Sequence, residues 1–235
     1  MYPLPMVALT ISLLAVGVAA LIVAASARMG WRAAGVAAAT LAVLMTVQWR
    51  LAEAGIVRQW ERVPPPLVPL VLVAMAVALA AALSPFGGRL VARVPLAAVV
   101  GFQAFRLPLE LAMHRAALDG LMPVQMSYSG WNFDIVTGVS AVVVAGLMAA
   151  DVAPRGLVVL WNALGSVLLV TIVAIAVAST PMFAAFGPDR LNTWVADAPY
   201  VWLPGVLVPA ALFGHLVTWR ALVLRWPEPR SAAHR

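Results

Sequence analysis

The chain has 235 residues, of which 64% are hydrophobic and only 10% are charged. Soluble domains typically carry about 25% charged residues, so a water-soluble fold of this composition would expose large apolar patches. The chain contains no Cys and no Lys, and its net charge of +6 comes from arginine. These absences exclude disulfides, Cys-ligated metals and covalent catalysis by thiol or lysine groups.

Seven apolar stretches are long enough to cross a bilayer, which requires roughly 20 residues of helix. They cover residues 6–27, 32–52, 66–84, 94–116, 134–151, 156–179 and 198–222. No basic residue precedes the first stretch, and it is longer than the apolar part of a signal peptide, so we interpret it as a span. We therefore expect an all-α fold: one transmembrane domain, residues 1–235, formed by a polytopic bundle of about seven helices.

The arginines predict an orientation for this bundle. With the N-terminus outside, the inner segments hold Arg28, Arg32, Arg89, Arg93, Arg155, Arg220, Arg225, Arg230 and Arg235. The outer segments then hold only Arg50, Arg58, Arg62, Arg115 and Arg190. Because cytoplasmic loops are enriched in arginine, we expect an outer N-terminus and a cytoplasmic C-terminus. The tryptophans fall near predicted span ends, as in an aromatic belt. In a bacterium this would be the inner (cytoplasmic) membrane.

The fourth predicted span differs from the others in carrying three ionisable side chains at a helical spacing. Arg106, Glu110 and His114 are four residues apart, so they share one helix face. A charge at membrane depth costs at least about 2.5–3.5 kcal/mol, so such residues usually face the bundle interior and mark a function. Pro108 predicts a kink, because its ring clashes with the carbonyl of Ala104. The alternative is structural: Arg106 and Glu110 would form a buried ion pair that fixes helix packing.

The segment after this span is rich in hydrogen-bonding groups and leads into the fifth span. Asn132 and Asp134 lie there at about the depth expected for His114. With Arg106 and Glu110, these three residues predict a polar pocket, for ligand binding or proton relay, that opens on the outer face. For Asp134 the alternative is a simple helix N-terminal position. The secondary candidates are Gln103, Tyr128, Arg50 and Glu53.

Metal and cofactor chemistry find little support in the sequence. Glu110, His114 and Asp134 form a generic set of metal ligands, but no HExxH motif, phosphate loop or GxSxG motif is present. His215 is expected near the inner half of the seventh span, too far from His114 for a shared metal or haem. Asn162 is expected to hydrogen-bond between helices or to its own backbone. We expect no metal and no cofactor.

Three functions remain compatible with these residues. The favoured one is binding or transport of a small polar solute or a proton through the outward-facing pocket. The second is a non-catalytic structural or assembly subunit of a larger membrane complex. The third is a membrane-embedded enzyme, acid–base or metal-dependent, acting on a lipid-soluble substrate; the sequence leans away from an enzyme. The expected partners are membrane lipids, a small polar ligand, and a homo-oligomer or larger membrane complex. Nucleic acid is not expected, because the arginines form no basic stripe between aromatics.

Overall fold

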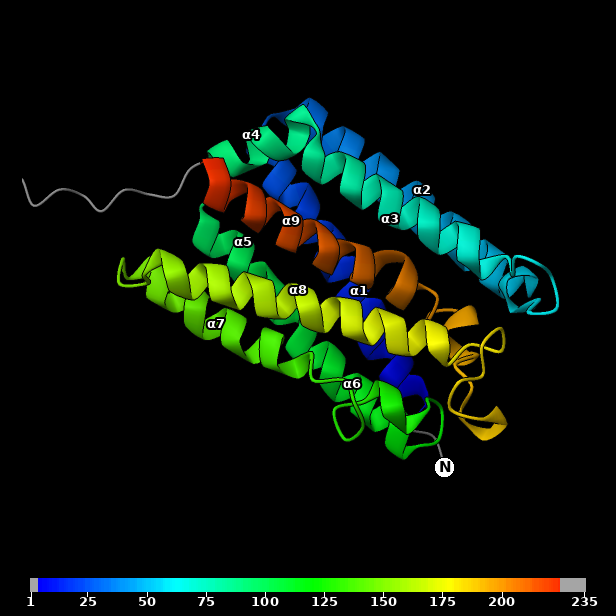
Figure 1. The fold of residues 1–235 in the computed structure, drawn as a ribbon. Helices are drawn as coiled ribbons and strands as arrows, with labels where there is room; N and C mark the ends of the chain where they lie inside the picture. Colours follow the sequence, from blue (N-terminus) through cyan, green and yellow to red (C-terminus); the bar gives the residue numbers. More distant parts are fainter. Residues whose placement is uncertain (1–3, 225–235) are drawn as a thin grey trace, which may run out of the picture.

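A computed structural model describes residues 4–224, which form a bundle of helices without strands (Figure 1). The all-α prediction is therefore confirmed over this range. The α-helices are α1 (Leu4–Ala27), α2 (Trp31–Glu53), α3 (Leu67–Leu83), α4 (Pro85–Arg93), α5 (Leu96–Phe102), α6 (Arg106–Leu118), α7 (Ile135–Ala149), α8 (Arg155–Ala178) and α9 (Val208–Leu224).

Five stretches of helix within the described range are long and apolar enough to cross a membrane. They are Met6–Ala27, Trp31–Glu53, Leu96–Leu118, Arg155–Ala178 and Leu203–Leu224. A sixth is present if α3 and α4, which are bent by 60° relative to each other, count as one broken span. The remaining apolar helix, α7, has 15 residues and is roughly 22 Å long, shorter than the ~30 Å hydrocarbon core. Five to six such helices indicate a membrane protein, and the seventh crossing stays a prediction.

The bend between α3 and α4 corrects one boundary, because residues 85–93 were expected to be a connection and form a helix instead. Ser84 caps α4: its side chain accepts a hydrogen bond from the amide of Phe86 at 3.1 Å, and Pro85 occupies the first turn. From α9, Arg220 Nη1 donates to the carbonyl oxygens of Ala82 (2.8 Å) and Ser84 (2.7 Å). The first bond satisfies a carbonyl that the end of α3 leaves without a helical partner, and the second is shared with the amide of Gly88, which also donates to Ser84.

Arg220→Ala is expected to lower the free energy of unfolding by about 1.5 kcal/mol, because hydrogen bonds from charged groups contribute roughly 1.5–3 kcal/mol and this side chain is only half-buried. The measurement is unfolding of the purified protein in detergent, followed by circular dichroism. Arg89→Ala on α4 is the matched control: Arg89 is exposed, so its loss is expected to change stability by less than about 0.5 kcal/mol. Equal losses in the two variants would contradict the role given to Arg220.

Small residues allow α7 to lie close to the helices before it. Ala141 is fully buried, and a Cβ atom added to Gly101 of α5 would lie 3.3 Å from the Cβ of Ala145. A Cβ atom on Gly138 would overlap the backbone amide of Leu107. Close contact of α7 with its neighbours therefore occurs at Ala141 and Ala145, whereas Ala149 is exposed at the helix end.

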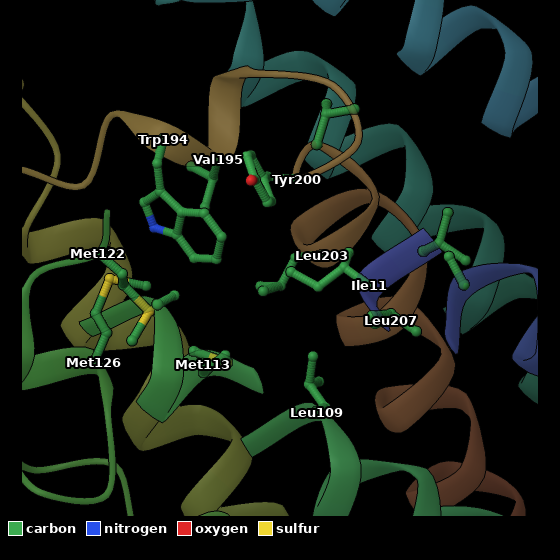
Figure 2. Close-up of a cluster of buried hydrophobic side chains, with 14 of the residues drawn as sticks. Ile11, Leu109, Met113, Met122, Met126, Trp194, Val195, Tyr200, Leu203 and Leu207 are labelled. Carbon is green, nitrogen blue, oxygen red and sulfur yellow. The ribbon is translucent and has the colours of Figure 1, made fainter. Parts of the chain in front are cut away.

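One end of the bundle is closed by loops that pack as part of the core. Figure 2 shows Trp194 and Val195 beside Tyr200, with Met122 and Met126 from the loop after α6. Trp194 is only 3% exposed. Trp161 on α8 is 5% exposed and donates to Ser140 on α7 at 2.9 Å. These two tryptophans are core residues, contrary to the expectation that each would belong to an aromatic belt.

Candidate functional site

The fourth predicted span is interrupted near its middle, as expected from Pro108. Between α5 and α6 the chain forms a 3-10 turn, η2 (Gln103–Phe105). Pro108 then lies in the first turn of α6, where backbone amides have no helical partner to lose. The break contains Ala104, the residue whose carbonyl would clash with the proline ring. The interruption brings Arg106 to the start of α6, facing α7 and α9.

Arg106 is 1% exposed and is held by two other helices. Its Nε donates to Asp134 Oδ2 at 2.6 Å, and its Nη2 is in ion-pair contact with the same carboxylate. Its Nη1 lies 2.8 Å from Nε2 of His215 on α9. Thr137 Oγ1, on α7, donates to the other oxygen of Asp134 at 3.2 Å. We call Arg106, Asp134, Thr137, His215 and Asn162 the Arg106 cluster.

The hydrogen bonds of His215 define its tautomer. A guanidinium group can only donate, so His215 Nε2 must accept from Arg106. The proton is then on Nδ1, which donates to Asn162 Oδ1 at 2.8 Å. Asn162 Nδ2 returns a hydrogen bond to the backbone carbonyl of His215 at 3.2 Å. His215 is therefore a neutral imidazole that fixes the guanidinium, with α8 and α9 tied together by Asn162.

His215 is the site residue that the sequence analysis missed. It was expected in the inner half of a span beginning at residue 198, but the apolar helical stretch begins at Leu203, which moves His215 to the middle of the span. An ionisable residue in the middle of an apolar span is itself a signal of function. That signal was present in the sequence. It was discounted because the depth of His215 was counted from residue 198, five residues before the helical stretch begins.

Glu110 has a different partner from the one that the structural alternative assigned to it. It is 2% exposed, and its Oε2 accepts from Asn132 Nδ2 at 2.7 Å. Asn132 also donates to the carbonyl of Met126 (3.0 Å) and accepts from the amide of Asp134 (3.0 Å). Among residues 4–224, no ion pair forms between Arg106 and Glu110; the counter-ion of Arg106 is Asp134. Asn132 thus joins Glu110 to the Arg106 cluster.

His114 lies in a separate group near the end of α6. Its Nδ1 is 3.1 Å from Ser127 Oγ and 3.0 Å from Ser129 Oγ, and its ring stacks on Tyr128 with centroids 4.2 Å apart. Neither Arg106 nor Glu110 is hydrogen-bonded to His114. The predicted line of three polar residues is therefore divided, and only Arg106 and Glu110 join the buried network.

The secondary candidates also separate. Gln103 is buried and donates from Nε2 to the carbonyl of Ala211 on α9 at 2.9 Å, so it joins the helices around the cluster. Arg50 and Glu53 pair with each other at 3.2 Å and are exposed. Within the described residues, no group of three or more His, Asp or Glu side chains has a geometry that holds a metal ion.

A cavity of about 520 Å³ adjoins the network. Arg106, Glu110 and Asp134 line it on one side. Most of the remaining wall is apolar and comes from α3, α6, α8, α9 and the turn that precedes α9. Several of these apolar side chains, including Leu109 and Leu203, are seen in Figure 2. Four of its apolar lining residues are exposed: Leu72 of α3 (62%), Val177 of α8 (47%), and Met182 (47%) and Phe183 (58%) of the loop after α8.

The turn before α9 shapes this wall. Residues Leu203–Leu207 (η6) form a π-helical turn that contains Pro204 and Gly205. Gln48 of α2 donates from Nε2 to the carbonyl of Gly205 at 3.0 Å, so the unusual turn is held by a neighbouring helix. Leu203 and Leu207 both face the cavity. π-Helical turns occur frequently at functional sites, which is consistent with a ligand site here.

Comparison with protein families, with curated proteins and with solved structures gives no match to this chain.

Proposed function

We propose that the protein binds a lipid-soluble molecule that has a polar head and a longer apolar part. The observation that carries this proposal is the asymmetric cavity, whose wall is apolar except for a few polar groups, with charged residues gathered on one side. Ligand sites typically measure about 300–1,000 Å³ and combine an apolar lining with a few well-placed polar groups. At about 520 Å³, this cavity falls within that range.

The position of the opening supports entry from the bilayer. Leu72 and Val177 line the cavity and are exposed apolar residues on helices α3 and α8, which lie on either side of α9 in Figure 1. In a membrane such residues face acyl chains, so a hydrophobic ligand reaches the cavity from the bilayer without crossing water. The hypothesis of a small polar solute or proton passing through the pocket remains a prediction, and the apolar lining favours a ligand that carries hydrocarbon.

We also propose that the chain crosses the membrane seven times, with its N-terminus outside. The bent pair α3–α4 and the short helix α7 then make the two weaker crossings. The exposed Arg28, Arg32, Arg93 and Arg155 support the orientation, because all lie at helix ends assigned to the cytoplasm, and Arg89 lies in the middle of the short helix α4 on the same side. The other residues predicted on the cytoplasmic side lie outside the described residues: Arg225, Trp226, Glu228, Arg230 and Arg235. In a bacterium the cytoplasmic membrane is the site that we propose.

A second candidate function is that of a subunit in a larger membrane complex. It is favoured by α2, because only 6% of an 18-residue apolar stretch of this helix is buried inside the bundle. Such a helix contacts either lipid or another protein. Stoichiometric partners that co-purify, and whose association is lost when α2 is altered, would select this function. An enzyme acting on a lipid-soluble substrate would use the same cavity as the binding function.

The binding proposal is tested by filling the cavity. Ala176 of α8 lines the cavity and is half-buried, so Ala176→Trp is expected to reduce bound lipid at least about tenfold, because the indole occupies the ligand volume. The measurement is mass spectrometry of the lipids that remain with the purified protein, together with equilibrium dialysis of radiolabelled lipid probes against the protein in nanodiscs.

Ala174→Trp is the matched control, because Ala174 lies on the same helix and is exposed away from the cavity lining. It is expected to retain lipid at the level of the unmodified protein. Equal retention by both variants, in proteins with unchanged thermal unfolding, would exclude the cavity as the binding site.

A further inference from the structure

We infer that the head of the ligand is an uncharged carbonyl group, and that Glu110 meets it as a neutral carboxyl group donating a hydrogen bond. This inference rests on the proposed function, because it presumes that the cavity holds a lipid-soluble molecule. It narrows the ligand to lipids with a carbonyl oxygen at one end, of which quinones and fatty esters are the two main sources. Four groups decide the chemistry: Arg106, Asp134 and Glu110, which line the cavity, and His215, which is hydrogen-bonded to Arg106.

Arg106, Asp134 and His215 hold one another by charge and hydrogen bonds without a ligand. The positive charge of Arg106 is compensated by Asp134, which accepts from Nε and is in contact with Nη2. His215 accepts from Nη1 and is neutral, as its bond to Asn162 requires. Beyond this ion-pair contact, the buried Nη2 makes no hydrogen bond within the described residues. The charge of the guanidinium is thus compensated within the protein, so no anionic lipid head is needed to neutralise it.

Glu110 takes no part in this charge compensation. Its only hydrogen bond within residues 4–224 is the one that Oε2 accepts from Asn132, which is an uncharged amide. Its other oxygen, Oε1, receives no hydrogen bond from the described chain, and Glu110 lines the cavity. An ionised carboxylate without a cationic partner is very costly against an apolar wall, and such groups become neutral instead.

A neutral Glu110 suits the observed contacts. Oε2 continues to accept from Asn132, while a proton on Oε1 gives the cavity wall a hydrogen-bond donor. The natural partner of that donor is an uncharged oxygen acceptor, and the carbonyl oxygen of a quinone or an ester is such an acceptor. The rest of the ligand then lies along the apolar wall formed by residues such as Leu109 and Leu207.

The test uses two substitutions of Glu110. Glu110→Gln has the same shape, cannot ionise, and keeps both an acceptor for Asn132 and a donor for the ligand; Glu110→Leu keeps neither. The probes are a decyl benzoquinone, a decyl ester, decylamine and decyl phosphate, each radiolabelled and dialysed against protein in nanodiscs, with empty nanodiscs subtracted. We expect at least one carbonyl probe to bind the unmodified protein and Glu110→Gln with dissociation constants within about threefold, and Glu110→Leu about tenfold more weakly.

The outcomes separate the inference from the function on which it rests. Preferred binding of decylamine that is lost in Glu110→Gln would overturn the inference, because it would show an ionised carboxylate paired with a cation. Preferred binding of decyl phosphate would overturn it as well. Binding of only the benzoquinone, or only the ester, supports it and identifies the source of the carbonyl. If no probe binds the unmodified protein better than Ala176→Trp, the proposed function itself fails.

An infrared measurement tests the state of Glu110 without a ligand. The absorption of a neutral carboxyl carbonyl is expected in the unmodified protein and is expected to decrease in Glu110→Gln. The difference spectrum between the two proteins isolates Glu110 from Asp134. A spectrum in which the substitution removes only ionised carboxylate absorption would overturn the inference, whether or not either variant binds lipid.

Discussion

Replacing Asp134 with alanine is expected to lower the free energy of unfolding by about 3–5 kcal/mol. The substitution leaves Arg106, which is 1% exposed, as a buried charge without its counter-ion, and breaking a buried pair costs about this much. The same variant also removes the acceptor of Thr137. The measurement is denaturation in mixed micelles by titration with sodium dodecyl sulfate, monitored by circular dichroism.

Two further proteins control this result. Asp119→Ala removes the partner of Arg115, an ion pair of 2.8 Å in which the arginine side chain is 57% exposed, and is expected to cost at most about 1 kcal/mol. The double substitution Arg106→Met with Asp134→Leu removes both buried charges, so it is expected to be more stable than Asp134→Ala. If Asp134→Ala costs no more than Asp119→Ala, the buried pair does not hold the helices together.

The spans that the sequence located best are those defined by a long local property. Residues 6–27, 32–52, 66–84 and 156–179 match α1, α2, α3 and α8 to within two residues at each end, because the composition of a long apolar run is read without knowledge of the rest of the chain. The helix that follows the bend at Ser84 was not predicted, although Ser84 and Pro85 are local signals of a helix start; nor was the contact of Ser84 with Arg220, which lies 136 residues away along the chain. A distant partner of this kind leaves no mark in a local pattern.

The candidate site shows the same division between local and distant information. The four-residue spacing correctly placed Arg106 and Glu110 together on the buried face of α6, since helix periodicity is local. Their actual partners, Asp134, Asn132 and His215, come from other segments. A local reading therefore paired Arg106 with Glu110, the nearest carboxylate in sequence, although Asp134 holds the arginine in the folded protein.

The cavity was beyond prediction for a further reason. Its wall is built from apolar residues on several helices, and each of them resembles an ordinary lipid-facing or core residue in the sequence. Whether Leu72 and Val177 face a space or a neighbour is decided by how closely α3 and α8 approach. The sequence accordingly favoured a small polar solute, because only the polar side of the site is recognisable from residue type.

Gly138→Ala is expected to lower the free energy of unfolding by about 3 kcal/mol. The added Cβ would overlap the amide nitrogen of Leu107 and lie 3.0 Å from Arg106 C, and backbone atoms cannot move aside as a flexible side chain does. The shift of α7 would also separate Asp134 from Arg106. Gly146→Ala is the control on the same helix: nothing lies within 4 Å of its added Cβ, so a helix-favouring alanine should gain about 0.5–1 kcal/mol. Micelle unfolding measures both, and a neutral Gly138→Ala would refute close packing of α7 on the site.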